Sequence, residues 1–125
     1  FMAIQNAAAT ALRDAAIPKA IKAKYERRLR KLVAALKQVG FACEMPGGTY
    51  FLYAKSPTAA AGKSFANAEE ASQFLIVDQS VCCVPWDDAG SFLRFSVTYT
   101  AKDEAEEDAI MAETVARLRK LDLKF

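Results

Sequence analysis

The chain has 125 residues, 53% of them hydrophobic and 26% charged, which is enough apolar material for one folded domain. Its 17 Lys and Arg against 15 Asp and Glu leave a net charge of +2, too small to indicate a polyanionic partner such as nucleic acid. No histidine is present, so Ser-His-Asp and Cys-His catalysis and His-ligated zinc are excluded within this chain. No apolar run approaches the ~20 residues of a membrane span, and we expect no membrane partner.

The three cysteines favour buried, reduced thiols over a disulfide or a metal site. Cys82 and Cys83 are neighbours, and adjacent residues of a strand point to opposite faces, so these two do not readily pair. Cys43 stands alone, and no CxxC spacing of a metal site occurs. We therefore expect a cytoplasmic protein without a metal centre.

The first forty residues read as two helices. Residues 1–16 are rich in alanine, start in a pattern typical of a helix interior, and end before Pro18. This start suggests that the chain is a piece of a larger protein. A second helix is expected from Pro18 to Gly40, because apolar residues recur at spacings of three and four. They are Ile21, Tyr25, Leu29, Leu32, Val33, Leu36 and Val39.

The rest of the chain alternates between strand and helix patterns. Asn67 and Glu70 resemble a capping box that starts a helix through about Asp78. A last helix begins at Thr100–Asp103, and acidic residues in its first turns and basic ones in its last complement the helix dipole. The predicted segments are strand 41–44, turn 46–48, strand 49–54, loop 56–64, helix 67–78, strand 81–84, loop 85–91, strand 92–99 and helix 103–121. This order predicts an α/β (α+β) fold, a two-layer sandwich in which helices cover a small mixed β-sheet.

Strand 92–99 carries the candidate site. Alternation places Leu93, Phe95, Val97 and Tyr99 on a core face and sets Arg94 among Phe92, Ser96 and Thr98 on the other. A guanidinium there reaches solvent, pairs with an acid, or awaits an anion. The residues alone favour an ion pair with Asp87 or Asp88. The functional alternative is that Arg94 binds a substrate carboxylate with two hydrogen bonds.

The other candidate functional residues have less support from the sequence. Seven basic residues lie between Lys19 and Lys31, but they surround an apolar stripe without interleaved aromatic residues, which favours a solvated helix face over a nucleic-acid contact. Gly47-Gly48 lacks the rest of a phosphate-loop motif and indicates a turn. Nothing around Lys63 indicates the desolvated pocket that a Schiff-base lysine needs. Trp86 either lines a pocket or pins a loop, and the sequence does not separate the two.

The order of several motifs resembles the class I/II aminotransferases of pyridoxal-phosphate fold type I, over nearly the whole chain but only the C-terminal third of such an enzyme. Within the family, the ending looks most like LL-diaminopimelate or aspartate aminotransferases. The motifs are Met2-Ala3-Ile4-Gln5, Tyr25-Glu26-Arg27-Arg28, Gly40-Phe41, Pro46-Gly47-Gly48-Thr49-Tyr50-Phe51-Leu52, Val84-Pro85 and Gly90-Ser91-Phe92-Leu93-Arg94-Phe95-Ser96.

The resemblance implies which part of the chain links to another domain and which residues bind the substrate. Residues 1–40 would be helices that link to a missing large domain, and residues 41–125 the C-terminal small domain. Arg94 would bind the substrate α-carboxylate, which outweighs the ion pair, while Trp86 and Phe92 could line the pocket. The resemblance further implies pyridoxal phosphate as cofactor, amino acids and 2-oxo acids as substrates, and a homodimeric parent.

The resemblance also implies what this chain lacks. The Schiff-base lysine and most cofactor-binding groups lie upstream in the family, so we expect no catalytic and no cofactor-binding residue here, and an inactive fragment. The loop Pro85–Gly90 departs from the family, whose members often have a Phe-Gly pair before the arginine, so substrate preference is not carried over. The competing function is a non-catalytic binding or protein-interaction domain that uses the basic helix 19–31.

Overall fold

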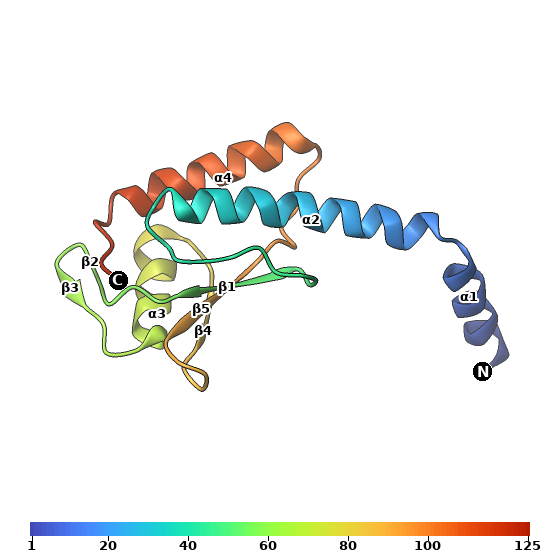
Figure 1. The fold of residues 1–125 in the computed structure, drawn as a ribbon, viewed down its shortest axis with the longest axis horizontal. Helices are drawn as coiled ribbons and strands as arrows, with labels where there is room; N and C mark the ends of the chain where they lie inside the picture. Colours follow the sequence, from blue (N-terminus) through green and yellow to red (C-terminus); the bar gives the residue numbers. More distant parts are fainter.

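The computed structural model describes residues 1–125 and confirms a mixed α/β domain with four helices (Figure 1). The helices are α1 (Met2–Arg13), α2 (Ala16–Lys37), α3 (Ala68–Gln79) and α4 (Glu104–Arg119). The strands are β1 (Phe51–Lys55), β2 (Ala59–Ala60), β3 (Lys63–Ser64), β4 (Val84–Trp86) and β5 (Phe92–Ser96). No helix is long and apolar enough to cross a membrane.

The main sheet has the strand order β1-β5-β4, so the strand that carries Arg94 is central. Both of its pairings are antiparallel, and β2 and β3 form a separate antiparallel pair. The prediction of a mixed sheet was wrong in this respect. The chain passes from β1 through α3 to β4, which runs in the same direction as β1, but β5 lies between them and pairs antiparallel with both.

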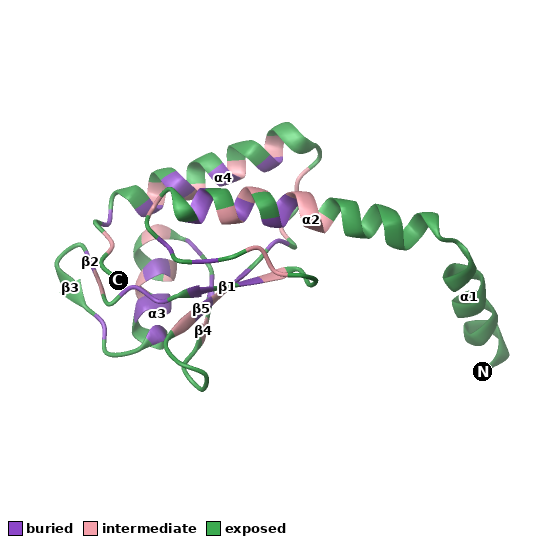
Figure 2. Cartoon of the chain, in the orientation of Figure 1, coloured by how far each residue is buried: buried purple, intermediate pink, exposed green.

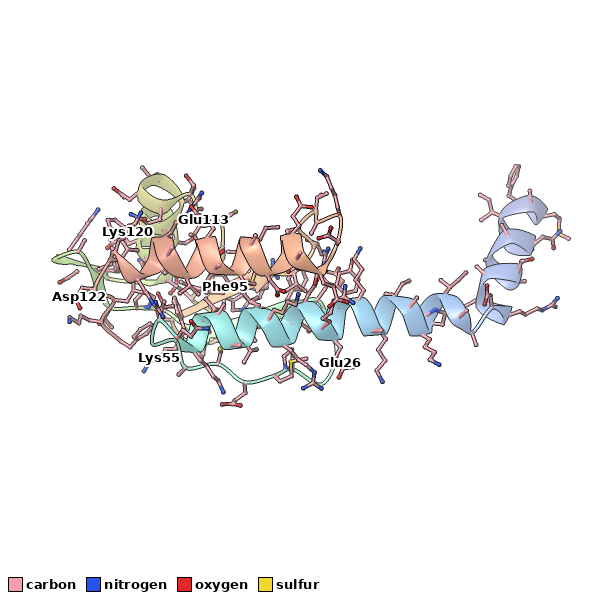
Figure 3. The ribbon with its side chains drawn as sticks, turned by 90° about the horizontal axis from the view of Figure 1, so that it is seen from above. Glu26, Lys55, Phe95, Glu113, Lys120 and Asp122 are labelled. Carbon is pink, nitrogen blue, oxygen red and sulfur yellow. The ribbon has the colours of Figure 1, made fainter.

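Helices cover only one face of this sheet. Leu52, Ala54, Leu93 and Phe95 alternate along β1 and β5 and are each at most 4% exposed. They pack with apolar residues of α2, α3 and α4 in one core cluster. Seen from above, α2 and α4 run side by side (Figure 3). The opposite face of the sheet has no helix against it, and the side chains on it are partly or largely exposed.

Helix α1 and the first half of α2 project from this body as an arm (Figure 1). Helix α1 has no buried residue, and the burial of α2 begins only at Arg28 (Figure 2). Ile21, which belongs to the predicted apolar stripe, is 51% exposed, whereas Leu29, Leu32 and Leu36 of the same stripe are in the core. The arm therefore presents apolar side chains that nothing in this chain covers.

Several predicted boundaries shift. Residues 41–44 are not a strand, although Phe41 and Cys43 are buried. The predicted strand 81–84 begins only at Val84 and continues into the predicted loop, because Pro85 and Trp86 pair with β5. The predicted loop 56–64 contains β2 and β3. The prediction that all three thiols are buried holds for Cys43 and Cys83, but Cys82 is exposed.

The predicted starts of α3 and α4 are confirmed, whereas α2 begins at Ala16, two residues before the predicted Pro18. The Asn67 side chain accepts a hydrogen bond from the Glu70 N–H at 2.9 Å, and Asp103 accepts one from the Glu106 N–H at 2.9 Å. Each satisfies an N–H group that the first turn of a helix leaves free. The reciprocal glutamate contact falls one residue earlier than in a capping box, because Glu70 accepts from the Ala66 N–H rather than from Asn67.

Candidate functional site

Arg94 lies in the middle of the uncovered sheet face. In the register of the sheet it stands between Tyr53 of β1 and Val84 of β4. Because side chains alternate along a strand, the same face carries the residues two positions away on each strand. These neighbours are Phe51, Lys55, Trp86, Phe92 and Ser96. The predicted alternation of strand 92–99 is confirmed, with Leu93, Phe95 and Val97 on the core side.

The Arg94 guanidinium has no acidic partner in this chain. Its Nε is buried and donates no hydrogen bond, and Arg94 takes part in no ion pair. Asp87, one of the two acids favoured from the residues alone, accepts a hydrogen bond from the Ala68 N–H at 2.9 Å at the start of α3. The predicted ion pair with Asp87 or Asp88 was therefore wrong. A buried donor without an acceptor costs about 1–3 kcal/mol, which makes Arg94 a candidate for binding an anion.

Two aromatic rings hold the Arg94 head group. Its guanidinium carbon lies 4.5 Å from the ring centroid of Phe51 and 5.2 Å from that of Trp86. Trp86 meets the Tyr53 ring edge-on at 6.1 Å. The sequence left open whether Trp86 lines a pocket or pins a loop. In the structure its ring lies beside the Arg94 guanidinium. Phe51 was missed from the sequence, since its place next to Arg94 depends on a strand register that no local pattern fixes.

Phe92 lies on the same face, two residues before Arg94, and packs against the turn that joins β4 to β5. A Cβ built at Gly90 would approach the Phe92 ring to 3.0 Å, and Gly90 has a φ of +109°. Both observations require glycine at this turn. Phe92 thus lines this face of the sheet, while its ring secures the turn that brings Trp86 next to it.

Arg28 shows that the basic helix is not simply a solvated face. This residue is 2% exposed and donates to the Glu107 carboxylate at 2.7 Å and to the carbonyls of Val97 and Tyr99 at 3.2 and 2.6 Å. Arg27 and Lys31 also pair with Glu107. Hydrogen bonds from Arg27, and then from Arg28 and Lys31, lower the pKa of Glu107 to about 2. Three of the seven basic residues are therefore committed to α4.

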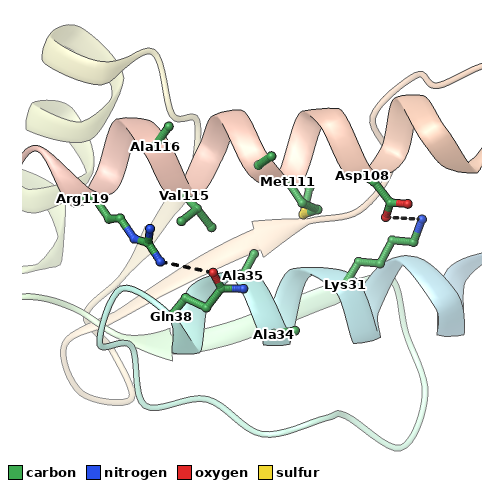
Figure 4. A pocket seen from close by; sticks show the side chains of 10 residues that line it. Lys31, Ala34, Ala35, Gln38, Asp108, Met111, Val115, Ala116 and Arg119 are labelled. Atoms are coloured by element: carbon green, nitrogen blue, oxygen red, sulfur yellow. Dashed lines mark hydrogen bonds and ion pairs between the residues drawn. The ribbon is translucent and has the colours of Figure 1, made fainter.

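The cavities lie away from Arg94. A groove of about 460 Å³ between α2 and α4 has a floor of alanine side chains, closed at its ends by Lys31–Asp108 and Arg119–Gln38 contacts (Figure 4). A larger cleft of about 900 Å³ lies between the first half of α2 and the turn at Pro46–Thr49. Neither contains a cluster of acidic or nucleophilic side chains.

No group of side chains in the chain could hold a metal ion. Lys63 lies 5.7 Å from the Phe74 ring centroid, on an exposed strand. Burial raises the pKa of Cys83 to about 11, so this thiol is not an activated nucleophile. Arg94 therefore remains the candidate functional residue of the chain.

Comparison with known proteins identifies the family. The model of the aminotransferases of class I and II matches residues 2–110. The chain belongs to this family. It is 45% identical to an LL-diaminopimelate aminotransferase of Methanocaldococcus jannaschii and 44% identical to one of Methanococcus maripaludis, in each case over the whole chain and 32% of the relative. The chain thus spans about a third of the length of these relatives.

Solved aminotransferases share the fold. An N-succinyldiaminopimelate aminotransferase of Mycobacterium tuberculosis superposes with a TM-score of 0.67 at 26% identity, over 90% of this chain and 30% of that one. An aromatic aminotransferase of Pyrococcus horikoshii gives 0.66 at 27% identity, over 94% and 32%. The predicted resemblance to class I/II aminotransferases is confirmed, and the relatives include the LL-diaminopimelate group expected from the sequence.

Proposed function

We propose that this chain is the C-terminal small domain of an aminotransferase that transfers an amino group between an amino acid and a 2-oxo acid. The observation that carries the proposal is Arg94, a partly buried guanidinium with an unpaired Nε on the uncovered sheet face of a class I/II aminotransferase chain. LL-diaminopimelate is the first donor to test, because the relatives at 45% and 44% identity bear its name.

Arg94 binds the substrate α-carboxylate. A planar guanidinium offers two parallel N–H groups to a carboxylate, so it fixes the orientation of the acid as well as its position. The carboxylate supplies the acceptor that the buried Nε lacks, which makes binding favourable at a site that costs free energy when empty. Holding the carboxylate orients the α C–H bond for proton removal, a positioning effect.

Class I/II aminotransferases use pyridoxal phosphate, and the unpaired Arg94 fits a role beside such a group rather than a role in holding it. When bound, pyridoxal phosphate acts as the electron sink for the amino group transfer. We assign no lysine of this chain to the cofactor, because none lies in a matching motif. By this assignment the isolated chain is inactive.

The arm fits a link to a further domain. Helix α1 exposes Phe1, Met2, Ile4 and Leu12 at between 67 and 89%, an apolar surface that a partner would cover. We propose that residues 1–40 join the small domain, residues 41–125, to the cofactor-binding domain. The second half of α2 belongs to the core of the small domain, so the helix spans both parts. A homodimeric parent and a cytoplasmic location stay predictions.

Arg94→Ala in the intact aminotransferase tests the proposal. Loss of a desolvated charge partner should lower kcat/KM for LL-diaminopimelate with 2-oxoglutarate by about 2–5 kcal/mol of transition-state stabilisation. Arg119→Ala, on the exposed surface at the end of α4, is the matched control and should leave kcat/KM unchanged. A nearly unchanged kcat/KM for Arg94→Ala would refute the role of Arg94.

The competing binding-domain function has less support. Arg27, Arg28 and Lys31 neutralise Glu107 and Asp108 of α4, so the basic helix offers fewer free charges than its sequence indicates. Nucleic-acid affinity of the isolated chain that falls steeply with salt would favour this alternative.

A further inference from the structure

We propose that Phe51 and Trp86 form an aromatic clamp that positions Arg94 for carboxylate binding, with Trp86 as a positioning residue. The inference rests on the proposed role of Arg94. An acidic side chain holds a structural arginine in place through an ion pair. In this proposal the ring of Trp86 holds Arg94 in place instead.

The clamp comes from both strands that flank Arg94. Phe51 pairs with Ser96 and Trp86 with Phe92, so each ring is a diagonal neighbour of Arg94, one on either side along β5. The guanidinium carbon is 4.5 Å from one ring centroid and 5.2 Å from the other, within the range of cation–π contacts. Two rigid strands thus fix the position of the head group.

Trp86 is itself held from two directions. Its backbone is in β4, and the next residue, Asp87, is tied to the N-terminus of α3 through the Ala68 N–H at 2.9 Å. The Tyr53 ring, across the strand that carries Arg94, meets the indole at an interplanar angle of 90°. The indole therefore lies where the loop Pro85–Gly90, which departs from the family pattern, meets the sheet.

Aromatic partners leave the donors of Arg94 free. A ring attracts the flat face of a guanidinium, whereas the N–H groups point outward in its plane. Phenylalanine has no acceptor, and the indole of tryptophan is a donor only, so neither competes with a carboxylate. An aspartate in the same place would hold Arg94 equally well but would occupy its binding edge. The clamp thus fixes the head group without occupying its hydrogen-bond donors.

The test uses the intact aminotransferase and two competitive inhibitors, each of which keeps one kind of charged group of LL-diaminopimelate. Pimelate retains the carboxylates, and 1,5-diaminopentane retains only the amines. Trp86→Leu should raise the inhibition constant of pimelate about tenfold, as expected for loss of one cation–π contact, and leave that of 1,5-diaminopentane unchanged. Trp86→Phe should restore most of the affinity. Val84→Ile, which adds neither a ring nor a hydrogen-bonding group beside Arg94, is the control and should leave both inhibition constants unchanged.

Arg94→Lys separates this inference from the proposed function. If Arg94→Lys weakens pimelate binding strongly and Trp86→Leu does not, the clamp is wrong and the role of Arg94 stands. If Arg94→Lys is neutral, the role of Arg94 fails. An equal effect of Trp86→Leu on both inhibitors would mean that the variant only disturbs the fold, and would also overturn the clamp.

A second measurement needs no substrate. Trp86 is the only tryptophan, so its emission in the 125-residue chain reports on the guanidinium beside it. Arg94→Met should shift the emission spectrum, and Arg13→Met on the exposed arm should not. An unchanged spectrum in Arg94→Met would show that the two groups are not stacked and would overturn the proposal.

Discussion

Two arginines of this domain have opposite surroundings. Arg28 donates hydrogen bonds to the Glu107 carboxylate and to two backbone carbonyls, and its guanidinium carbon lies 4.5 Å from the Tyr99 ring centroid. Arg94 has only rings around it and a buried Nε without an acceptor. Arg28 is bonded to acceptors of its own fold, whereas Arg94 keeps a donor without an acceptor, which supports the proposal that Arg94 binds a ligand. The contrast separates the two roles without reference to any catalytic motif.

Arg28→Met should have the largest effect on stability. It removes one partner of a buried ion pair and leaves the Val97 and Tyr99 carbonyls without their donor, so the free energy of unfolding should fall by about 3–5 kcal/mol. Chemical denaturation of the chain measures this. Arg30→Met, in an exposed pair two residues from Arg28, should change it by at most about 0.5 kcal/mol. Similar losses for both variants would contradict the special status of Arg28.

Low pH should weaken the ion pair between Arg28 and Glu107. The pKa of Glu107 is about 2 in the folded chain, below its ordinary 4.5, chiefly because of its hydrogen bond with Arg27. A lowered folded pKa means that the stabilisation is complete above pH 4.5 and is lost as the pH falls toward 2. The free energy of unfolding should therefore decline over that window. In Glu107→Gln the decline should be shallower, and an equally steep one would place the acid-sensitive group elsewhere.

Arg94→Met should behave in the opposite way from Arg28→Met. It removes a buried donor that has no acceptor and replaces it with a flexible apolar chain that packs well against Phe51 and Trp86. The free energy of unfolding should stay the same or rise by up to about 1 kcal/mol. A loss as large as that of Arg28→Met would show that Arg94 is a structural residue.

The sequence predicted these two arginines unequally well. Alternation along strand 92–99 placed Arg94 correctly, because the period of a strand is visible in a single segment. The absence of its ion pair was not visible, since whether Asp87 faces Arg94 or the start of α3 depends on where the chain turns after Trp86. Arg28 was predicted to lie on a solvated helix face, which is wrong, because its partner Glu107 lies 79 residues away and no local spacing reveals it.

The boundary errors have the same origin. Helix starts were predicted well, because a cap such as Asn67 satisfies its own helix within a few residues. The ends of β4 and the pair β2–β3 were not, because a strand ends where its partner ends. Membership of the class I/II aminotransferases followed from motif order alone, and the match over residues 2–110 confirmed it.

Val84→Glu is designed to give Arg94 a carboxylate partner within the chain, as Glu107 is for Arg28. Val84 stands opposite Arg94 in the register and is 42% exposed, so a glutamate there can reach the guanidinium at small desolvation cost. An exposed cross-strand ion pair adds only about 0.2–1 kcal/mol, so denaturation should show the smallest stability change of the series. Pimelate inhibition of the intact enzyme should nevertheless be lost, since an internal carboxylate then occupies the donors of Arg94. Val84→Gln, which matches the size of glutamate without its charge, should retain inhibition. If Val84→Glu also retains it, the carboxylate binds somewhere other than Arg94.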